Sequence, residues 1–232
     1  MKFLIQQVVD WSEVWALLIP LIVLYKRKPA DPWVRPLKYY LWIAFIINLL
    51  ADITWKRFKL NIEDWMRHNL SSLYESNGDF NNTILYNIHS VLRLMLFAWF
   101  FSYVNNVFKK MNRVLEPLFL LSAVVLFVFF KDIREFNSLL LASEAALLLV
   151  YCLAYYFIIL RDEDSNIRKL PSFWAVTGLS IYVVINFPIF LFYNVLANQS
   201  ENFANNIWDI HNLSYLLLCI FIAKSFYAAG KQ

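Results

Sequence analysis

Long apolar runs separated by short polar stretches dominate this chain. About 20 apolar helical residues cross the hydrocarbon core of a membrane, and seven runs reach that length. They lie at residues 3–25, 37–55, 83–107, 114–130, 137–160, 171–197 and 206–227. The pattern therefore predicts an all-α fold: a polytopic membrane protein whose residues 1–232 form a single seven-transmembrane-helix bundle.

The composition agrees with a membrane protein. Hydrophobic residues make up 60% of the chain and charged residues 16%, whereas soluble domains average about 45–50% and about 25%. The apolar stretch from Phe3 to Val9 is interrupted by Asp10 too early for a secretory signal. We expect the first spanning helix to serve as the insertion signal of a multi-pass protein in a plasma or inner membrane.

The distribution of Lys and Arg predicts the orientation. Thirteen of these residues flank one side of the predicted spans and seven flank the other, which places the N-terminus outside and the C-terminus in the cytoplasm. The only long connection, residues 57–82, is then extracytoplasmic. Its apolar residues recur at helical spacing, which predicts a short amphipathic helix that acts either as a lid or as an interfacial anchor.

Several ionisable residues lie inside the apolar runs: Asp52, His89, Arg93, Glu144, Asp209 and His211. An ionised Asp, Lys or Arg at the centre of a spanning helix costs roughly 2.5–3.5 kcal/mol, so such residues mark a functional site by default. At 1.5 Å per helical residue, most of them lie about 5–10 Å below the outer boundary, and Arg93 lies about 15 Å below it. Glu13 of the first span belongs to the same outer layer.

The helical faces predict that this polar layer points into the bundle. Residues three, four or seven positions apart share one helix face. Three such stripes are Asn48–Asp52–Trp55, Tyr86–His89–Arg93 and Trp208–His211–Asn212–Tyr215. Arg93, the deepest charge, requires an anionic partner, and the candidates are Asp52, Glu144 and Asp209.

We predict a ligand-binding pocket in this layer. Asn186 joins it because it precedes Pro188, which leaves the carbonyl of Val184 without its helical hydrogen bond and kinks the sixth span beside the layer. The complete predicted ligand set is Asp52, His89, Arg93, Glu144, Asn186, Asp209, His211 and Tyr215. A structural ion-pair network without any ligand remains an alternative interpretation.

A metal site is a narrower hypothesis for the same layer. His89, His211, Glu144 and Asp209 combine imidazole and carboxylate ligands that suit zinc or another divalent ion. No His-x-x-x-His or His-Glu-x-x-His spacing supports it, since the ligands would come from separate helices.

Three functions remain open from the sequence. The first is a membrane receptor or sensor that binds a small polar ligand or ion in the outer half of the bundle. The second is an intramembrane metal-dependent hydrolase acting on a lipid, and the third is a proton-coupled transporter of small solutes. The chain has three glycines, too few for a Gly-rich phosphate loop. Short cytoplasmic connections predict a separate cytoplasmic signalling partner, and no nucleic-acid partner is expected.

Overall fold

The computed structural model describes residues 8–9, 11–55, 82–130, 137–161, 167–197 and 201–230. These residues form helices and contain no β-strand. The helices are α2 (Ser12–Arg27), α3 (Val34–Trp55), α5 (Thr83–Val104), α6 (Asn106–Val125), the π-helical turn η2 (Leu126–Phe130), α7 (Ser138–Leu160), the 3-10 turn η3 (Ile167–Lys169), α8 (Pro171–Ala197) and α9 (Glu201–Ala229).

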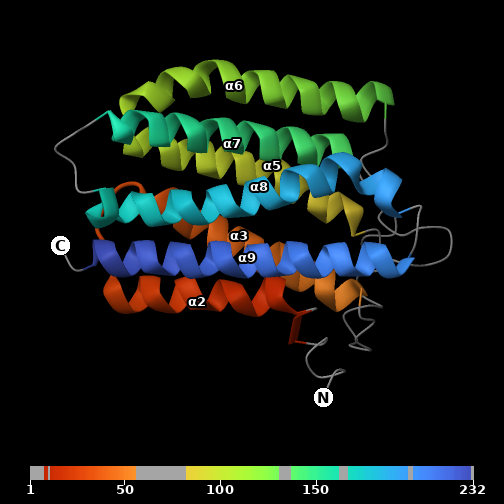
Figure 1. Cartoon of the computed structure of the whole chain (residues 1–232), viewed down its shortest axis with the longest axis horizontal. Coiled ribbons are helices and arrows are strands. Elements are labelled where there is room, and N and C mark those ends of the chain that lie inside the picture. The colour runs from red at the N-terminus through yellow and green to blue at the C-terminus, as the bar shows by residue number, and fades with distance from the viewer. Residues whose placement is uncertain are drawn as a thin grey trace, which may run out of the picture.

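The long helices lie side by side, and each runs opposite to the one before it in the chain (Figure 1). Six of them, within the described residues, are long and apolar enough to cross a membrane. The seventh, α2, has 16 residues in the described range and packs along α9 and α3. The prediction of an all-α membrane bundle is confirmed, and the protein is a multi-pass integral membrane protein. Seven spans and the orientation stay predictions.

Polar residues set the beginnings of two helices. Asn105 has an extended backbone, and its side-chain oxygen accepts a hydrogen bond from the amide of Val107 (2.9 Å). This N-cap starts α6 eight residues earlier than the apolar pattern at 114–130 predicted. Asn137 caps α7 in the same way through the amide of Leu140 (3.1 Å). The apolar content of the sequence locates the spanning part of α6, but it misses the more polar beginning of this helix.

The helix α6 lies at the outer edge of the bundle (Figure 1). It packs against α5 and α7 only weakly compared with the inner helices. Apolar side chains of α6 and of the turn η2 that follows it are largely exposed: Val114, Leu118, Leu121 and Val124 of α6, and Val128 and Phe129 of η2. In a membrane protein such a face contacts lipid tails.

Aromatic side chains fill the half of the bundle beyond Arg93 on α5. Phe97, Phe100 and Phe101 are fully buried. Phe100 contacts Trp33 with 5.9 Å between ring centroids, and Phe101 stacks on Tyr151 at 5.2 Å. This apolar packing confines the buried charges to the other half of the bundle. The predicted amphipathic helix at 57–82 lies, apart from Asn82, outside the described residues.

Candidate functional site

Arg93 and Glu144 form a buried, two-pronged ion pair between α5 and α7. The Nε of Arg93 donates to Oε1 of Glu144, and Nη2 donates to Oε2 at 2.7 Å. Glu144 is completely buried and Arg93 is 5% exposed. A guanidinium matches a carboxylate in this parallel geometry, which fixes both side chains. Of the three acids considered as partners for Arg93, Glu144 is the one that pairs with it.

Two hydroxyl groups complete the surroundings of this pair. Ser90 donates to Oε2 of Glu144 at 2.6 Å, and Nη1 of Arg93 donates to the hydroxyl oxygen of Tyr182 at 2.6 Å. The pair therefore ties α5 to both α7 and α8. Buried charges need such additional hydrogen bonds, because desolvation otherwise exceeds the attraction between the two ions.

A second polar group joins α2, α8 and α9 around His211. Its Nε2 lies 3.0 Å from Oε1 of Glu13, and its Nδ1 contacts Oδ1 of Asn186. The Trp208 ring stacks on the imidazole with 4.9 Å between centroids. The amide of Asn48 donates to the backbone oxygen of Glu13 at 3.1 Å, which adds α3 to the group. His211 is thus held on both ring nitrogens and on one face.

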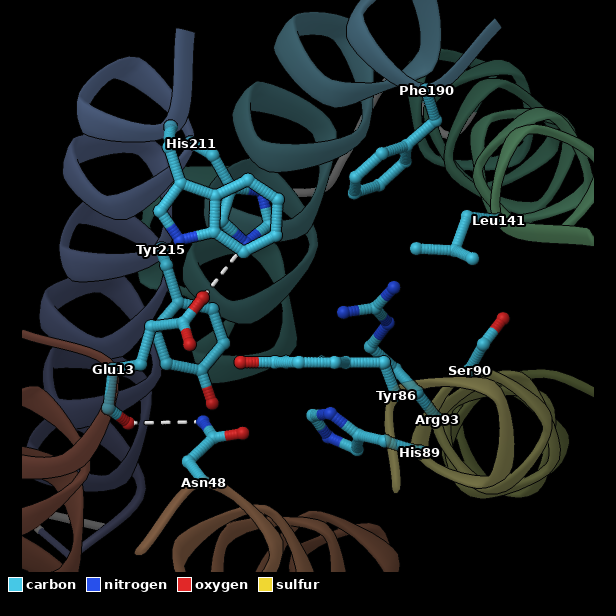
Figure 2. Close-up of a pocket in the computed structure, with 11 residues that line it drawn as sticks. Glu13, Asn48, Tyr86, His89, Ser90, Arg93, Leu141, Phe190, His211 and Tyr215 are labelled. Carbon is cyan, nitrogen blue, oxygen red and sulfur yellow. Dashed lines mark hydrogen bonds and ion pairs between the residues drawn. The ribbon is translucent and has the colours of Figure 1, made fainter. Parts of the chain in front are cut away.

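A small cavity lies between the Arg93–Glu144 and Glu13–His211 pairs. Its volume is about 20 Å³, and it is lined by Glu13, Asn48, Tyr86, His89, Ser90, Arg93, Leu141, Phe190, Trp208, His211 and Tyr215. Figure 2 shows these side chains converging from opposite sides of the bundle. One buried water needs about 10–15 Å³ in this measure. The cavity therefore accommodates one or two water-sized groups.

One atom on the cavity wall lacks a hydrogen-bond partner among the described residues: Nε2 of His89. The hydroxyl of Tyr215, on the same wall, pairs with the hydroxyl of Tyr40. His89 and Tyr215 are 5% and 2% exposed. Figure 2 shows the His89 ring reaching from α5 toward Asn48 and the Tyr215 hydroxyl. The ring also stacks on Tyr40, with 6.2 Å between centroids. Leaving a buried polar atom without a partner costs about 1–3 kcal/mol, so Nε2 of His89 favours a polar occupant of the cavity.

The structure brings together part of the predicted ligand set. His89, Arg93, His211 and Tyr215 line the cavity. Glu144 and Asn186 lie behind the wall, where they hold Arg93 and His211. Their roles in this geometry are to position other side chains.

Asp52 and Asp209 are half-buried and do not line the cavity. Asp52 lies three residues before the end of α3, and Asp209 lies eight residues after the start of α9. The position of a residue along its helix indicates whether it lies at the level of the cavity. The direction of its side chain around the helix axis decides whether it reaches the cavity.

The four residues of the predicted metal set are not grouped. Among the described residues, no three His, Cys, Asp or Glu side chains lie close enough to hold a metal ion together. The physical reason is that Glu144 is occupied by Arg93 and Ser90, whereas His211 is occupied by Glu13 and Asn186. We therefore do not assign any of these residues as a metal ligand.

Sequence reasoning missed several residues of the site, and their signals differ. Tyr182 lies four residues before Asn186, on the same face of α8, and Ser90 lies three before Arg93 on α5. Both could have been found by extending the polar stripes by one turn. Phe190 and Leu141 gave no signal, because an apolar side chain in an apolar span has no distinguishing neighbour in the sequence.

No family model, curated protein or solved structure matches this chain.

Proposed function

We propose that this protein is a membrane receptor or sensor that binds a small polar ligand or ion in the cavity between the two polar pairs. The observation that carries the proposal is that a buried polar atom on the cavity wall, Nε2 of His89, has no hydrogen-bond partner among the described residues. A purely structural ion-pair network would satisfy its own donors and acceptors.

The size and the lining of the cavity restrict the ligand. A volume of about 20 Å³ admits an ion or one or two small polar groups, whereas sites for drug-sized molecules measure about 300–1,000 Å³. Arg93 uses three of its five N–H groups in the described contacts. The wall thus offers guanidinium, hydroxyl and imidazole groups from α5 and α9, together with the Glu13 carboxylate from α2.

A ligand bound in this cavity can change the opposite end of the bundle by moving the helices that line the cavity. The wall residues come from α2, α3, α5, α7, α8 and α9. The described connections at the opposite end are short, at residues 28–33 and at residue 105. With the N-terminus outside, this end faces the cytoplasm, and a separate cytoplasmic partner would receive the signal.

The other two functions considered from the sequence, a metal-dependent lipid hydrolase and a proton-coupled transporter, have no supporting observation of their own in the described residues. The receptor or sensor is therefore the function that we propose.

Small ions provide the test of this site. The thermal unfolding midpoint of the purified protein in nanodiscs would be measured against sodium, potassium, ammonium and chloride at constant ionic strength. A ligand present at 100 times its Kd adds about 2.7 kcal/mol of stability. We expect at least one ion to raise the midpoint with saturation, and His89→Phe, which removes Nε2 and keeps the ring against Tyr40, to abolish the rise.

Tyr156→Phe is the matched control, because it removes a hydroxyl from a separate, part-buried hydrogen-bonded group with Thr177 and Ser180. This variant should keep the response of the unmodified protein. The proposal fails if no ion gives a saturable shift, or if His89→Phe responds as the unmodified protein does.

A further inference from the structure

The orientation of the Asn186 amide is determined by its neighbours. One end of the amide lies 2.7 Å from the backbone oxygen of Tyr182, and a carbonyl oxygen only accepts hydrogen bonds. This end is therefore the NH₂ group. It also donates to the hydroxyl of Ser214 at 2.7 Å, since that hydroxyl uses its own hydrogen on the backbone oxygen of His211 (2.7 Å). The opposite end of Asn186, which faces His211, must be the carbonyl oxygen.

This orientation determines where His211 carries a hydrogen. Oδ1 of Asn186 is an acceptor and contacts Nδ1 of His211, so Nδ1 must be protonated. A neutral imidazole with a hydrogen on Nδ1 presents a lone pair at Nε2. Nε2 lies 3.0 Å from a carboxylate oxygen of Glu13, at hydrogen-bond distance.

Two lone pairs cannot form that contact, so a proton must lie between Nε2 and Oε1. It belongs either to an imidazolium facing a carboxylate or to a carboxylic acid facing a neutral imidazole. In both forms the two side chains share one proton and the pair has no net charge. Both residues are more than nine-tenths buried, where an uncompensated charge is costly.

We propose that Glu13 and His211 form a proton-binding site that controls the attachment of α2 to α8 and α9. The inference rests on the proposed function and deepens it by naming the proton as a ligand on the cavity wall. When the proton leaves to water, a Glu13 carboxylate and an imidazole lone pair face each other, and the hydrogen bond between Glu13 of α2 and His211 of α9 is lost. Nδ1 of His211 keeps its hydrogen and goes on donating it to Oδ1 of Asn186.

Other titratable or charged groups surround this pair. They come from every helix that packs around it: Asp52 of α3, Tyr86, His89 and Arg93 of α5, Glu144 of α7, Tyr182 of α8, and Asp209 and Tyr215 of α9. Arg93 and Glu144 compensate each other at contact distance. The contact between Glu13 and His211 differs from that pair, because it forms only when one of its two side chains carries an additional proton.

The direction of the pH dependence follows from proton counts. Separated Glu and His side chains lose their protons near pH 4.3 and pH 6.5. Between these values the separated groups and the pair both hold one proton, so stability is level. Above about pH 6.5 the separated groups hold none, whereas the folded contact between Nε2 and Oε1 requires one. Stability then falls as the pH rises, by about tenfold in the folding equilibrium per pH unit.

Glu13→Gln tests the proton site directly. The glutamine amide occupies the same place and donates its own N–H to Nε2 of a neutral His211, so the contact no longer needs a shared proton. Thermal unfolding in nanodiscs would be followed from pH 5 to pH 8.5. We expect the unmodified protein to lose stability above about pH 6.5 and Glu13→Gln to lack this loss. Glu116→Gln, an acid on α6, should behave as the unmodified protein does.

Nitrogen-15 NMR of the histidine rings provides a second measurement that does not depend on the folding of Glu13→Gln. The chain has three histidines, and single substitutions of His68 and His89 assign the His211 signals. We expect Nδ1 of His211 to remain protonated from pH 5 to pH 8.5. A bare Nδ1 in this range, or the same loss of stability in Glu13→Gln, overturns the proton site.

The two proposals fail separately. His89→Phe leaves Glu13 and His211 in place and should keep the pH dependence. If pH dependence vanishes in Glu13→Gln while no ion stabilises the unmodified protein, the cavity binds no ion and the proton site stands. If an ion stabilises the protein through His89 while Glu13→Gln keeps the pH dependence, the proton site alone is wrong.

Discussion

Glu144→Leu lowers the free energy of unfolding by about 3–5 kcal/mol, the expected cost of leaving one member of a buried ion pair without its partner. Arg93 would keep its charge within the bundle after losing both hydrogen bonds to the carboxylate. The Ser90 hydroxyl would lose its acceptor as well. The quantity to measure is the unfolding free energy in detergent micelles, compared with Glu116→Leu, in which the replaced carboxylate is not part of this network.

The double variant Arg93→Met/Glu144→Leu separates the cost of an unpaired charge from the value of the pair. Replacing both members by apolar side chains of similar volume is often neutral or stabilising. We expect the double variant to be more stable than Glu144→Leu alone. Equal or lower stability would mean that the pair itself, and not the isolated charge, accounts for the loss.

Gly178→Ala is expected to destabilise the contact between α8 and α9 by about 1–3 kcal/mol, the usual cost of adding an atom to a filled core. A Cβ atom at Gly178 would lie 2.5 Å from Cβ of Phe221 and 3.4 Å from Cα of Leu218. Neither atom is the end of a flexible side chain, so the two helices must separate. Small residues allow this close approach between membrane helices.

Thermal unfolding midpoints of three variants check this explanation. Val184→Leu, an exposed position on the same helix, should leave the midpoint nearly unchanged. Phe221→Ala combined with Gly178→Ala should not rescue stability, because alanine retains the Cβ atom that makes the clash. Full rescue by Phe221→Ala would show that the aromatic ring, and not the helix backbone, limits the space.

The polar layer was predicted from the sequence because its physical signal is strong. His89, Arg93 and His211 interrupt apolar runs at positions where an ionisable group is costly. Their spacing on helix faces also identified Tyr215 as a neighbour of His211. The partner of Arg93 could be narrowed to three acids, but the choice of Glu144 depends on how α5 and α7 are rotated against each other.

The metal hypothesis shows where depth along a helix is insufficient. His89, Glu144 and His211 lie in one layer of the bundle. Glu144 nevertheless forms its hydrogen bond with Arg93, whereas His211 contacts Glu13 and Asn186. Opposite charges and hydrogen-bond donors within contact distance determine which side chains pair. The number of residues that separate two side chains in the sequence does not predict whether they pair.

The amino-acid sequence by itself determined that the chain forms apolar helices for a membrane and that ionisable side chains gather in one half of the bundle, because hydropathy and the 1.5 Å helical rise act locally. Only the tertiary structure decided that Glu13, 198 residues before His211, forms its hydrogen-bonded neighbour. It also decided that a cavity remains beside His89 and Tyr215. Helix rotation and packing set both, and they depend on all the helices at once.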